Sequence, residues 1–283
     1  MNISEYNLSI DRIAEFKNIT AGYQPFILND STISICRSYW PPNTPEFELF
    51  YNRKQKTYDG TPVDSHGHKN AGSHMVLNRS DATESEWKYY MAHNLRMLKM
   101  NEDLISLAIK FITDISISTV LDIGCNDGSL LFTALKKGFK SGTGFDQESH
   151  SECIGFMKKL TKLNGSFIQN QYDMYKHQFD KTIVSDFVIC SAVLPHISDP
   201  VYFLDTISKL TNKVLLLTGG ISQESGKKII YGGKPNRYGG KFPYGFTHSN
   251  KITVELLNYS LMECGFKEVY EVEHDLTWPD KYW

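Results

Sequence analysis

Residues 120–130 constrain the fold more than any other part of the chain, and they read V-L-D-I-G-C-N-D-G-S-L. The aliphatic and β-branched run from Ser118 to Ile123 is typical of a buried parallel strand. It is followed by a turn that contains Gly124 and Gly128, and then by a segment of helical composition over 129–137. A strand, a glycine turn and a helix in this order aim backbone N–H groups and a helix N-terminus at a bound ligand.

Further hydrophobic runs follow at intervals that suit a doubly wound α/β sheet. We expect strands at 141–146, 166–168, 186–190 and 213–218. Asp146 ends the first of these, about 20 residues beyond the glycine turn, where a doubly wound nucleotide-binding fold places the carboxylate that takes the ribose hydroxyls. The order of elements therefore predicts an α/β fold with a nucleoside-binding edge.

The pattern D-x-G-C-x-x-G at residues 122–128 resembles the S-adenosylmethionine loop of class I methyltransferases. A pyrophosphate would instead prefer a G-x-G-x-x-G turn without the carboxylate of Asp122. The resemblance implies a doubly wound, Rossmann-like class I methyltransferase sheet, with S-adenosylmethionine as cofactor and S-adenosylhomocysteine as product. The alternative is an NAD-binding or ligand-free α/β domain with an accidental match.

The same resemblance assigns residues to the cofactor. Asp122 is expected to orient the methionine amino group, Asp146 to accept from both ribose hydroxyls, and Gly124 and Gly128 to let the backbone approach. Cys125 is expected to be a small filler in the loop and not a nucleophile. The other residues expected around the cofactor are Asn126, Gln147, Gln171, Tyr172 and Ser191, with Gln171 or Tyr172 beside the adenine.

Residues 192–200 read A-V-L-P-H-I-S-D-P and resemble the G-V-L-Y-H-R-x-x-P element of the tRNA wobble-uridine carboxymethyltransferases and of their sugar- and small-molecule-methylating relatives. The wider match covers roughly residues 84–275 and includes 85–88 and 236–238. In the carboxymethyl enzymes a tyrosine and an arginine flank the histidine, and the tyrosine helps to hold the extra carboxylate of their cofactor. Pro195 and Ile197 stand there in this chain and donate no side-chain hydrogen bond, which favours ordinary S-adenosylmethionine.

Residues just past the fourth strand lie beside the methyl group in this fold, so we expect His196 to act as general base or substrate-orienting group. The alternative is a structural histidine at the start of the next helix, which Asp199 is expected to cap. His248 is the second candidate for the base. The expected substrate contacts are Trp87, Tyr231, Arg237 and Tyr238. Packing on the sheet is the alternative for Trp87, and a solvated loop charge is the alternative for Arg237.

Composition divides the chain into regions. Residues 1–82 are rich in turn residues and aromatics, and we expect an accessory or substrate-capping region with a helix at 10–16 and a strand at 47–54. Residues 83–283 are expected to form the S-adenosylmethionine-binding domain, which begins with one or two helices and a capping box at Thr83.

The glycine-rich stretch 219–247 predicts a long lid-like loop after the fifth strand. Beyond it we expect a helix capped by Ser249 and stopped at Gly265, then a strand at 266–272. A final antiparallel strand could come only from 276–283, so it is either short or lost to truncation.

The net charge is −2, from 30 basic and 32 acidic residues, and lacks the basic excess usual in proteins that bind many phosphates. We therefore expect a small polar acceptor, with O-methylation of a sugar, sugar phosphate or related metabolite. Nucleic acid is disfavoured as a substrate but not excluded. The alternatives are a tRNA or other RNA methyltransferase and a catalytically silent cofactor-binding partner subunit.

Neither a bilayer-spanning apolar run nor a signal-peptide start is present, so we expect a cytoplasmic protein with no membrane partner. A homo-oligomer is left open. The five cysteines form no C-x-x-C pair and are expected to be structural thiols. His66, His68 and His74 have no acidic or cysteine partner at characteristic spacing, so no metal site is predicted.

Overall fold

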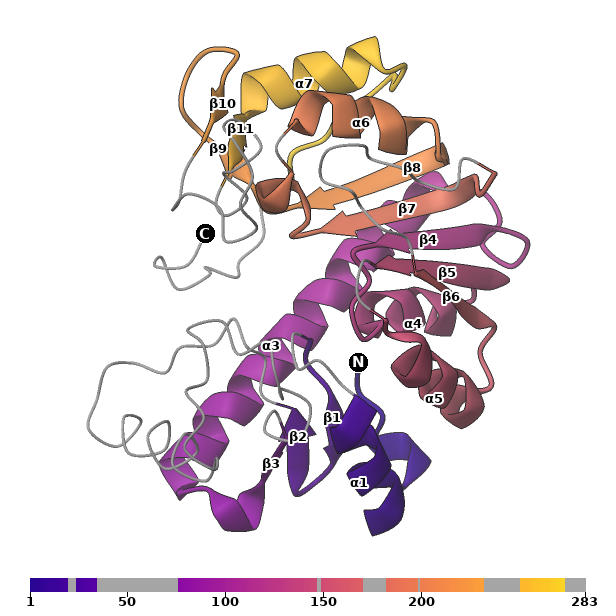
Figure 1. Cartoon of the computed structure of the whole chain (residues 1–283), viewed down its shortest axis with the longest axis vertical. Coiled ribbons are helices and arrows are strands. Elements are labelled where there is room, and N and C mark those ends of the chain that lie inside the picture. The colour runs from indigo at the N-terminus through magenta and orange to yellow at the C-terminus, as the bar shows by residue number, and fades with distance from the viewer. Residues whose placement is uncertain are drawn as a thin grey trace.

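The computed structural model describes residues 1–19, 24–34, 76–146, 149–169, 182–197, 199–231 and 250–272. Two lobes are joined by the long helix α3 (Glu84–Ala108), which runs from the N-terminal lobe to the central sheet (Figure 1). Among the described residues, no helix has both the length and the apolar character that crossing a membrane requires.

The central sheet has five parallel strands in the order β6-β5-β4-β7-β8. Their bounds are β4 Thr119–Ile123, β5 Ser141–Asp146, β6 Gly165–Gln169, β7 Ser185–Ser191 and β8 Thr211–Thr218. The first strand of this sheet in chain order is β4, which lies in the middle of the sheet. The chain then adds β5 and β6 on one side of it, and β7 and β8 on the other. This order confirms the doubly wound class I fold, in which ligands bind at the carboxyl ends of the strands where the winding reverses.

The two faces of the sheet are covered by different helices, and the alternation along each strand sorts its side chains between them. Val120 and Phe187 lie in the cluster that includes α3, α4 (Ser129–Lys136) and α5 (Ser151–Thr161). Leu121 and Val188 lie in the opposite cluster, with α6 (Pro200–Ser208) and α7 (Val254–Glu263). Burial of both faces explains why these strands read as continuous hydrophobic runs.

The N-terminal lobe holds an antiparallel sheet of β1 (Ile27–Asn29), β2 (Thr32–Ser34) and β3 (Val76–Asn78). Its short helices are η1 (Ser4–Tyr6), α1 (Ile10–Ile19) and η3 (Arg79–Asp81). Trp87, Tyr90 and Leu98 of α3 pack with Ile27, Ile33 and Leu77 of this sheet. The first half of α3 is therefore part of the lobe.

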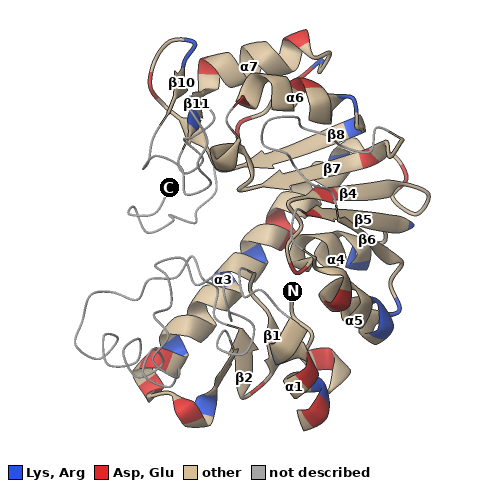
Figure 2. Ribbon diagram, in the orientation of Figure 1, with Lys and Arg blue, Asp and Glu red and all other residues tan. Residues whose placement is uncertain are grey.

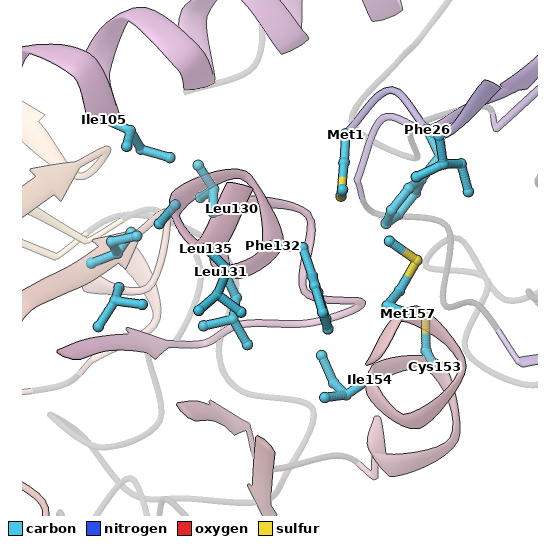
Figure 3. Packing of buried hydrophobic residues seen from close by; sticks show 14 of the residues in the cluster. Met1, Phe26, Ile105, Leu130, Leu131, Phe132, Leu135, Cys153, Ile154 and Met157 are labelled. Carbon is cyan, nitrogen blue, oxygen red and sulfur yellow. The ribbon is translucent and has the colours of Figure 1, made fainter. Parts of the chain in front are cut away.

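The core of the N-terminal lobe is continuous with the core beneath the central sheet. Met1 and Phe26 lie in one buried cluster with Phe132 of α4 and with Cys153 and Met157 of α5 (Figure 3). The rings of Phe16 and Phe156 are 5.7 Å apart between centroids. The burial of these apolar side chains holds the N-terminal lobe against α4 and α5, the two helices that lie beside the glycine turn. A domain boundary at residue 82 stays a prediction.

Several local predictions are confirmed. The first helix begins at Ile10, and the expected strands are β5, β6, β7 and β8. Thr83 and Glu86 form the capping box of α3, with N···O distances of 2.7 and 3.2 Å. Asp199 caps α6 by accepting from the N–H of Tyr202 at 3.1 Å. Gly265 follows the last helix with φ +98°, as expected of a glycine stop.

Two predictions after the fifth strand are wrong, and a third is wrong in part. The expected loop 219–247 contains two short strands, β9 (Ile221–Ser222) and β10 (Ile229–Ile230), and residues 232–247 of it lie outside the described residues. The helix does not begin at residue 250, because Lys251–Thr253 forms strand β11, which pairs with β9 and β10 in a small sheet. Ile252 is buried in the core between β9 and β10, with which it pairs. Residues 266–272 form no strand, since they find no pairing partner among the described residues and only Phe266 and Val269 pack on the core. The segments 47–54 and 276–283 lie outside the described residues.

Candidate active site

The glycine turn folds back over the end of β5. The N–H groups of Gly124 and Cys125 both donate to the carbonyl oxygen of Phe145, at 2.8 and 3.0 Å, and that of Gly128 donates to the Cys125 carbonyl at 2.9 Å. Gly124 and Gly128 have φ values of +70° and +82°, which side chains rarely adopt. A Cβ on Gly128 would also lie 2.4 Å from Cδ1 of Ile154. The turn therefore requires both glycines and brings the backbone close to any ligand at the strand ends.

Asp146 lies at the carboxyl end of β5, beside this turn. Its Oδ2 accepts a hydrogen bond of 2.8 Å from the N–H of Asn126. Its side chain keeps 15 % of its surface exposed. A partly exposed carboxylate held in place by the backbone suits an acceptor for two adjacent hydroxyls, so the geometry fits the ribose role expected of Asp146.

Asp122 is buried at the end of β4, and its Oδ2 accepts from the N–H of Leu131 in α4 at 3.1 Å. Burial raises the pKa of this carboxyl to about 8, and the nearby charge of Asp146 acts in the same direction. The carboxyl therefore gains little from nearby positive charge among the described residues. A cationic group such as the amino group of the cofactor would stabilise the ionised carboxylate.

His150 is a member of this cluster that sequence reasoning missed. Its Nδ1 lies 3.4 Å from Oδ1 of Asp127 in the turn, and its Nε2 lies 3.9 Å from Oδ1 of Asp146. The ring is 4 % exposed and meets Phe167 edge-on. Two features of the sequence could have indicated this contact: an aspartate in the glycine turn, and a histidine four residues beyond Asp146.

The turn after β7 forms the other side of the site. Ser191 ends β7, and its hydroxyl is hydrogen-bonded to that of Thr218 at the end of β8, at 2.8 Å. The chain then passes through Ala192 at φ +57° into the 3₁₀ helix η5 (Leu194–His196). His196 is exposed at the end of η5, and its N–H donates to the Val193 carbonyl at 2.9 Å. His196 therefore lies exposed past the carboxyl end of β7.

This turn packs directly on the glycine turn from Gly124 to Gly128, which we also call the cofactor turn. An ideal Cβ on Gly124 would lie 2.3 Å from Cγ2 of Val193, so the absence of a side chain at 124 is what allows the two turns to touch. Gly124 and the segment that carries His196 are therefore in van der Waals contact.

Asn250 holds the turn that carries His196 through two hydrogen bonds. Its N–H donates to the carbonyl of Pro195 at 3.1 Å, and its Nδ2 donates to that of Ile197 at 3.0 Å, with the side chain buried. Ile230 pairs with Lys251, the residue that follows Asn250. Sequence reasoning missed Asn250.

The remaining expected site residues divide into those that the structure places and those that it does not. Tyr231 is half-buried at the point where the chain leaves β10. Trp87 is 5 % exposed within the core of the N-terminal lobe, which supports the packing alternative. Outside the described residues lie Gln147, Gln171, Tyr172, Arg237, Tyr238 and His248.

The cysteines of the site are buried thiols. Burial raises the pKa of Cys125 and of Cys153 well above the ordinary value, so both are neutral and poorly nucleophilic at neutral pH. In the described part of the chain, no three His, Cys, Asp or Glu side chains gather closely enough to hold a metal ion. The residues His66, His68 and His74 lie outside that part.

A family model described as a methyltransferase domain matches residues 88–270, which is more than half of the chain. The chain belongs to this methyltransferase family. With its doubly wound sheet and its acidic glycine turn, the matched region is a class I S-adenosylmethionine-dependent methyltransferase domain, whose cofactor is S-adenosylmethionine.

Curated relatives match parts of this methyltransferase. A tRNA U34 carboxymethyltransferase of Campylobacter concisus is 31 % identical over 137 residues, which cover 48 % of this chain and 40 % of that protein. Nodulation protein NoeA of Rhizobium meliloti is 29 % identical over 77 residues, which cover 27 % of this chain and 16 % of that protein. The matched part of this chain thus spans less than half the length of either relative.

Solved structures of similar shape include two with bound S-adenosylhomocysteine. The N-terminal domain of EvdMO1 covers 81 % of this chain and 91 % of its own, at a TM-score of 0.46 and 13 % identity. Coclaurine N-methyltransferase, solved with N-methylheliamine and S-adenosylhomocysteine, covers 58 % of this chain and 47 % of its own, at a TM-score of 0.40 and 17 % identity.

Proposed function

We propose that this protein methylates a hydroxyl group of a small polar acceptor, such as a sugar, a sugar phosphate or a related metabolite, in the cytoplasm. The observation that carries the proposal is the position of His196. It is an exposed imidazole past the end of β7, on a turn that packs against the cofactor turn at Gly124. Imidazole titrates near neutrality and suits the removal of a hydroxyl proton.

S-adenosylmethionine, when bound, supplies a methyl group activated by its sulfonium. In the proposed site Asp146 accepts from the ribose, Asp122 faces the methionine amino group, and the backbone at Gly124 and Gly128 approaches the cofactor. His196 would accept the proton that the acceptor hydroxyl loses when it is methylated. Asn250 holds the backbone on both sides of His196, which limits the motion of the base.

The proposal is tested by methyl transfer from radiolabelled cofactor to panels of nucleotide sugars, sugar phosphates and free sugars. His196→Ala should lower kcat by roughly 10²–10⁴-fold, the range for loss of a general base. Its affinity for S-adenosylmethionine should stay unchanged. Lys209→Ala, an exposed change at the C-cap of α6, is the control and should keep both values. Full turnover by the His196→Ala protein would refute the assigned base.

The second candidate is methylation of tRNA, which the 31 % identity to a tRNA U34 carboxymethyltransferase supports. Such a substrate calls for a basic surface, whereas basic and acidic residues of the described chain lie interspersed on α1, α3 and α5 in the view of Figure 2. RNA binding that weakens steeply with salt would favour this candidate over a small acceptor.

The third candidate is a cofactor-binding subunit without turnover of its own. It predicts intact S-adenosylmethionine binding, no methyl transfer to any acceptor class, and an unaltered rate in a complex with an active partner after His196→Ala. Analytical ultracentrifugation of the wild-type protein would show whether a homo-oligomer forms.

A further inference from the structure

The helix that follows the glycine turn begins without a cap of its own. Position 128 is the N-cap of α4 and must be glycine, because its φ is +82° and Ile154 fills the space of a Cβ. Glycine has no side-chain acceptor, so it cannot satisfy the first N–H groups of the helix. A serine or aspartate at this position would cap the helix but would not fit.

Gln24 supplies the missing cap from 105 residues away. Its Oε1 accepts a hydrogen bond from the N–H of Ser129, the first residue of α4. Its Nε2 donates to the carbonyl oxygen of Cys125 at 3.0 Å, on the opposite side of the same turn. One amide group therefore spans the cofactor turn and holds its entry and its exit together.

The backbone of Gln24 is itself held by the N-terminal lobe. Its carbonyl accepts from the hydroxyl of Ser34 at 3.0 Å, and the same hydroxyl accepts from the N–H of Phe26 at 2.7 Å. The amide of Asn94 in α3 donates to the carbonyl of Ser34 at 2.7 Å. Buried and partly buried hydrogen bonds, joined through Ser34 and Gln24, thus link α3 to the cofactor turn.

We propose that Gln24 is a positioning residue of the cofactor site, which holds the turn 124–129 in the shape that S-adenosylmethionine binds. Gln24 requires no contact with the cofactor for this role. Its effect is to pre-form the turn, so that binding does not have to order it. The proposal depends on the cofactor assignment and is independent of the acceptor.

The test measures the affinity of the full-length protein for S-adenosylmethionine and S-adenosylhomocysteine by calorimetry, together with the melting temperature of the free protein. Gln24→Met keeps the length of the side chain but removes both hydrogen bonds, and affinity should fall by about ten- to thirty-fold. Gln24→Glu keeps an acceptor for Ser129 and loses the donor to Cys125, so its affinity should lie between those of Gln24→Met and the wild type.

Ser34→Ala is the matched control, because Ser34 supports the same segment without touching the turn. It should lower the melting temperature at least as much as Gln24→Met, with a smaller loss of affinity. Hydrogen exchange adds a local readout, since the amide of Ser129 should exchange faster in Gln24→Met than in Ser34→Ala.

Wild-type affinity in a folded Gln24→Met protein would overturn the proposal. It would also be overturned if Ser34→Ala and Gln24→Met had the same melting temperature and lost the same affinity. Should Gln24→Met not fold, Gln24→Glu decides, with wild-type affinity against the proposal and reduced affinity for it. A wild-type protein that binds neither nucleoside would instead overturn the cofactor assignment.

Discussion

The N–H of Asn126 donates a hydrogen bond of 2.8 Å to Oδ2 of Asp146. This contact joins the glycine turn after β4 to the acid at the end of β5, so the two parts of the proposed cofactor site support each other. The free protein therefore presents the carboxylate in a fixed position, which lowers the ordering cost of binding a nucleoside.

Asp146→Ala should weaken S-adenosylmethionine binding by roughly 2–3 kcal/mol, the scale for losing hydrogen bonds to a charged group. Calorimetric titration measures this directly. Asp186→Asn is the control, because Asp186 lies at the amino end of β7, accepts from the N–H of Thr119 and pairs with Lys213 at 3.1 Å. It should cost stability but not affinity. Equal affinity losses in the two variants would contradict the ribose role of Asp146.

Affinity for S-adenosylmethionine should rise between pH 6 and pH 8. Burial raises the pKa of Asp122 to about 8, so the free protein holds a proton on this carboxyl at pH 6. The cationic amino group of the cofactor favours the carboxylate, so binding at pH 6–7 releases a proton. Calorimetry in two buffers of different ionisation enthalpy measures that release. Asp122→Asn should bind more weakly and release no proton, and an unchanged proton release would show that another group titrates.

The same substitution carries a stability test with a defined sign. The pKa of an aspartate in an unfolded chain is about 3.9, so between pH 4 and pH 8 the folded state holds more protons at Asp122 than the unfolded state. This residue therefore lowers the free energy of unfolding as pH rises through that window. The melting temperature of Asp122→Asn relative to wild type should increase from pH 5 to pH 8. A constant difference would mean that Asp122 is ionised throughout.

His150 should matter for both stability and cofactor binding. Its imidazole faces the buried carboxylate of Asp127 and lies near Asp146. His150→Phe keeps an aromatic ring against Phe167 but removes both nitrogens, and we expect a loss of roughly 1–3 kcal/mol in the free energy of unfolding, the cost of leaving a buried hydrogen-bonding group without its partner. Urea unfolding measures the loss. His93→Phe, which changes another buried histidine, in α3, should leave affinity unchanged, whereas His150→Phe should reduce it.

Gly124→Ala should impair cofactor binding and the His196 turn together. The new methyl group would collide with Cγ2 of Val193. The turn would also hold the alanine at a positive φ, which costs roughly 1–2 kcal/mol from the backbone alone. Val193→Ala in the same chain removes the contact but not the backbone strain, so the double variant should recover part of the lost affinity and stability. Recovery of nothing would show that the two turns are not coupled through this contact.

Local sequence predicted the centre of the fold well. Buried parallel strands are recognisable in the sequence as hydrophobic runs. The turn from Asp122 to Gly128 is recognisable by its glycines, which adopt positive φ values that few other residues reach. Capping by Thr83 and Asp199 was also predictable, because a cap acts within three residues of itself.

Longer-range packing was not predictable in this way. Trp87 carries the same local pattern whether it faces a substrate or the sheet of β1, β2 and β3, and only the folded lobe decides. Gln24 lies 105 residues from the helix that it caps. Ile252 sits in a strand instead of a helix because β9 and β10 lie on either side of it.

The most direct test of the central claim is a parallel titration of the wild-type protein with S-adenosylmethionine, S-adenosylhomocysteine and NAD. The site built around Asp122, Asp146 and the glycine turn predicts micromolar binding of the first two and none of NAD. Binding of NAD in their place, or of none of the three, would contradict the assignment of these residues to S-adenosylmethionine and with it the role of His196.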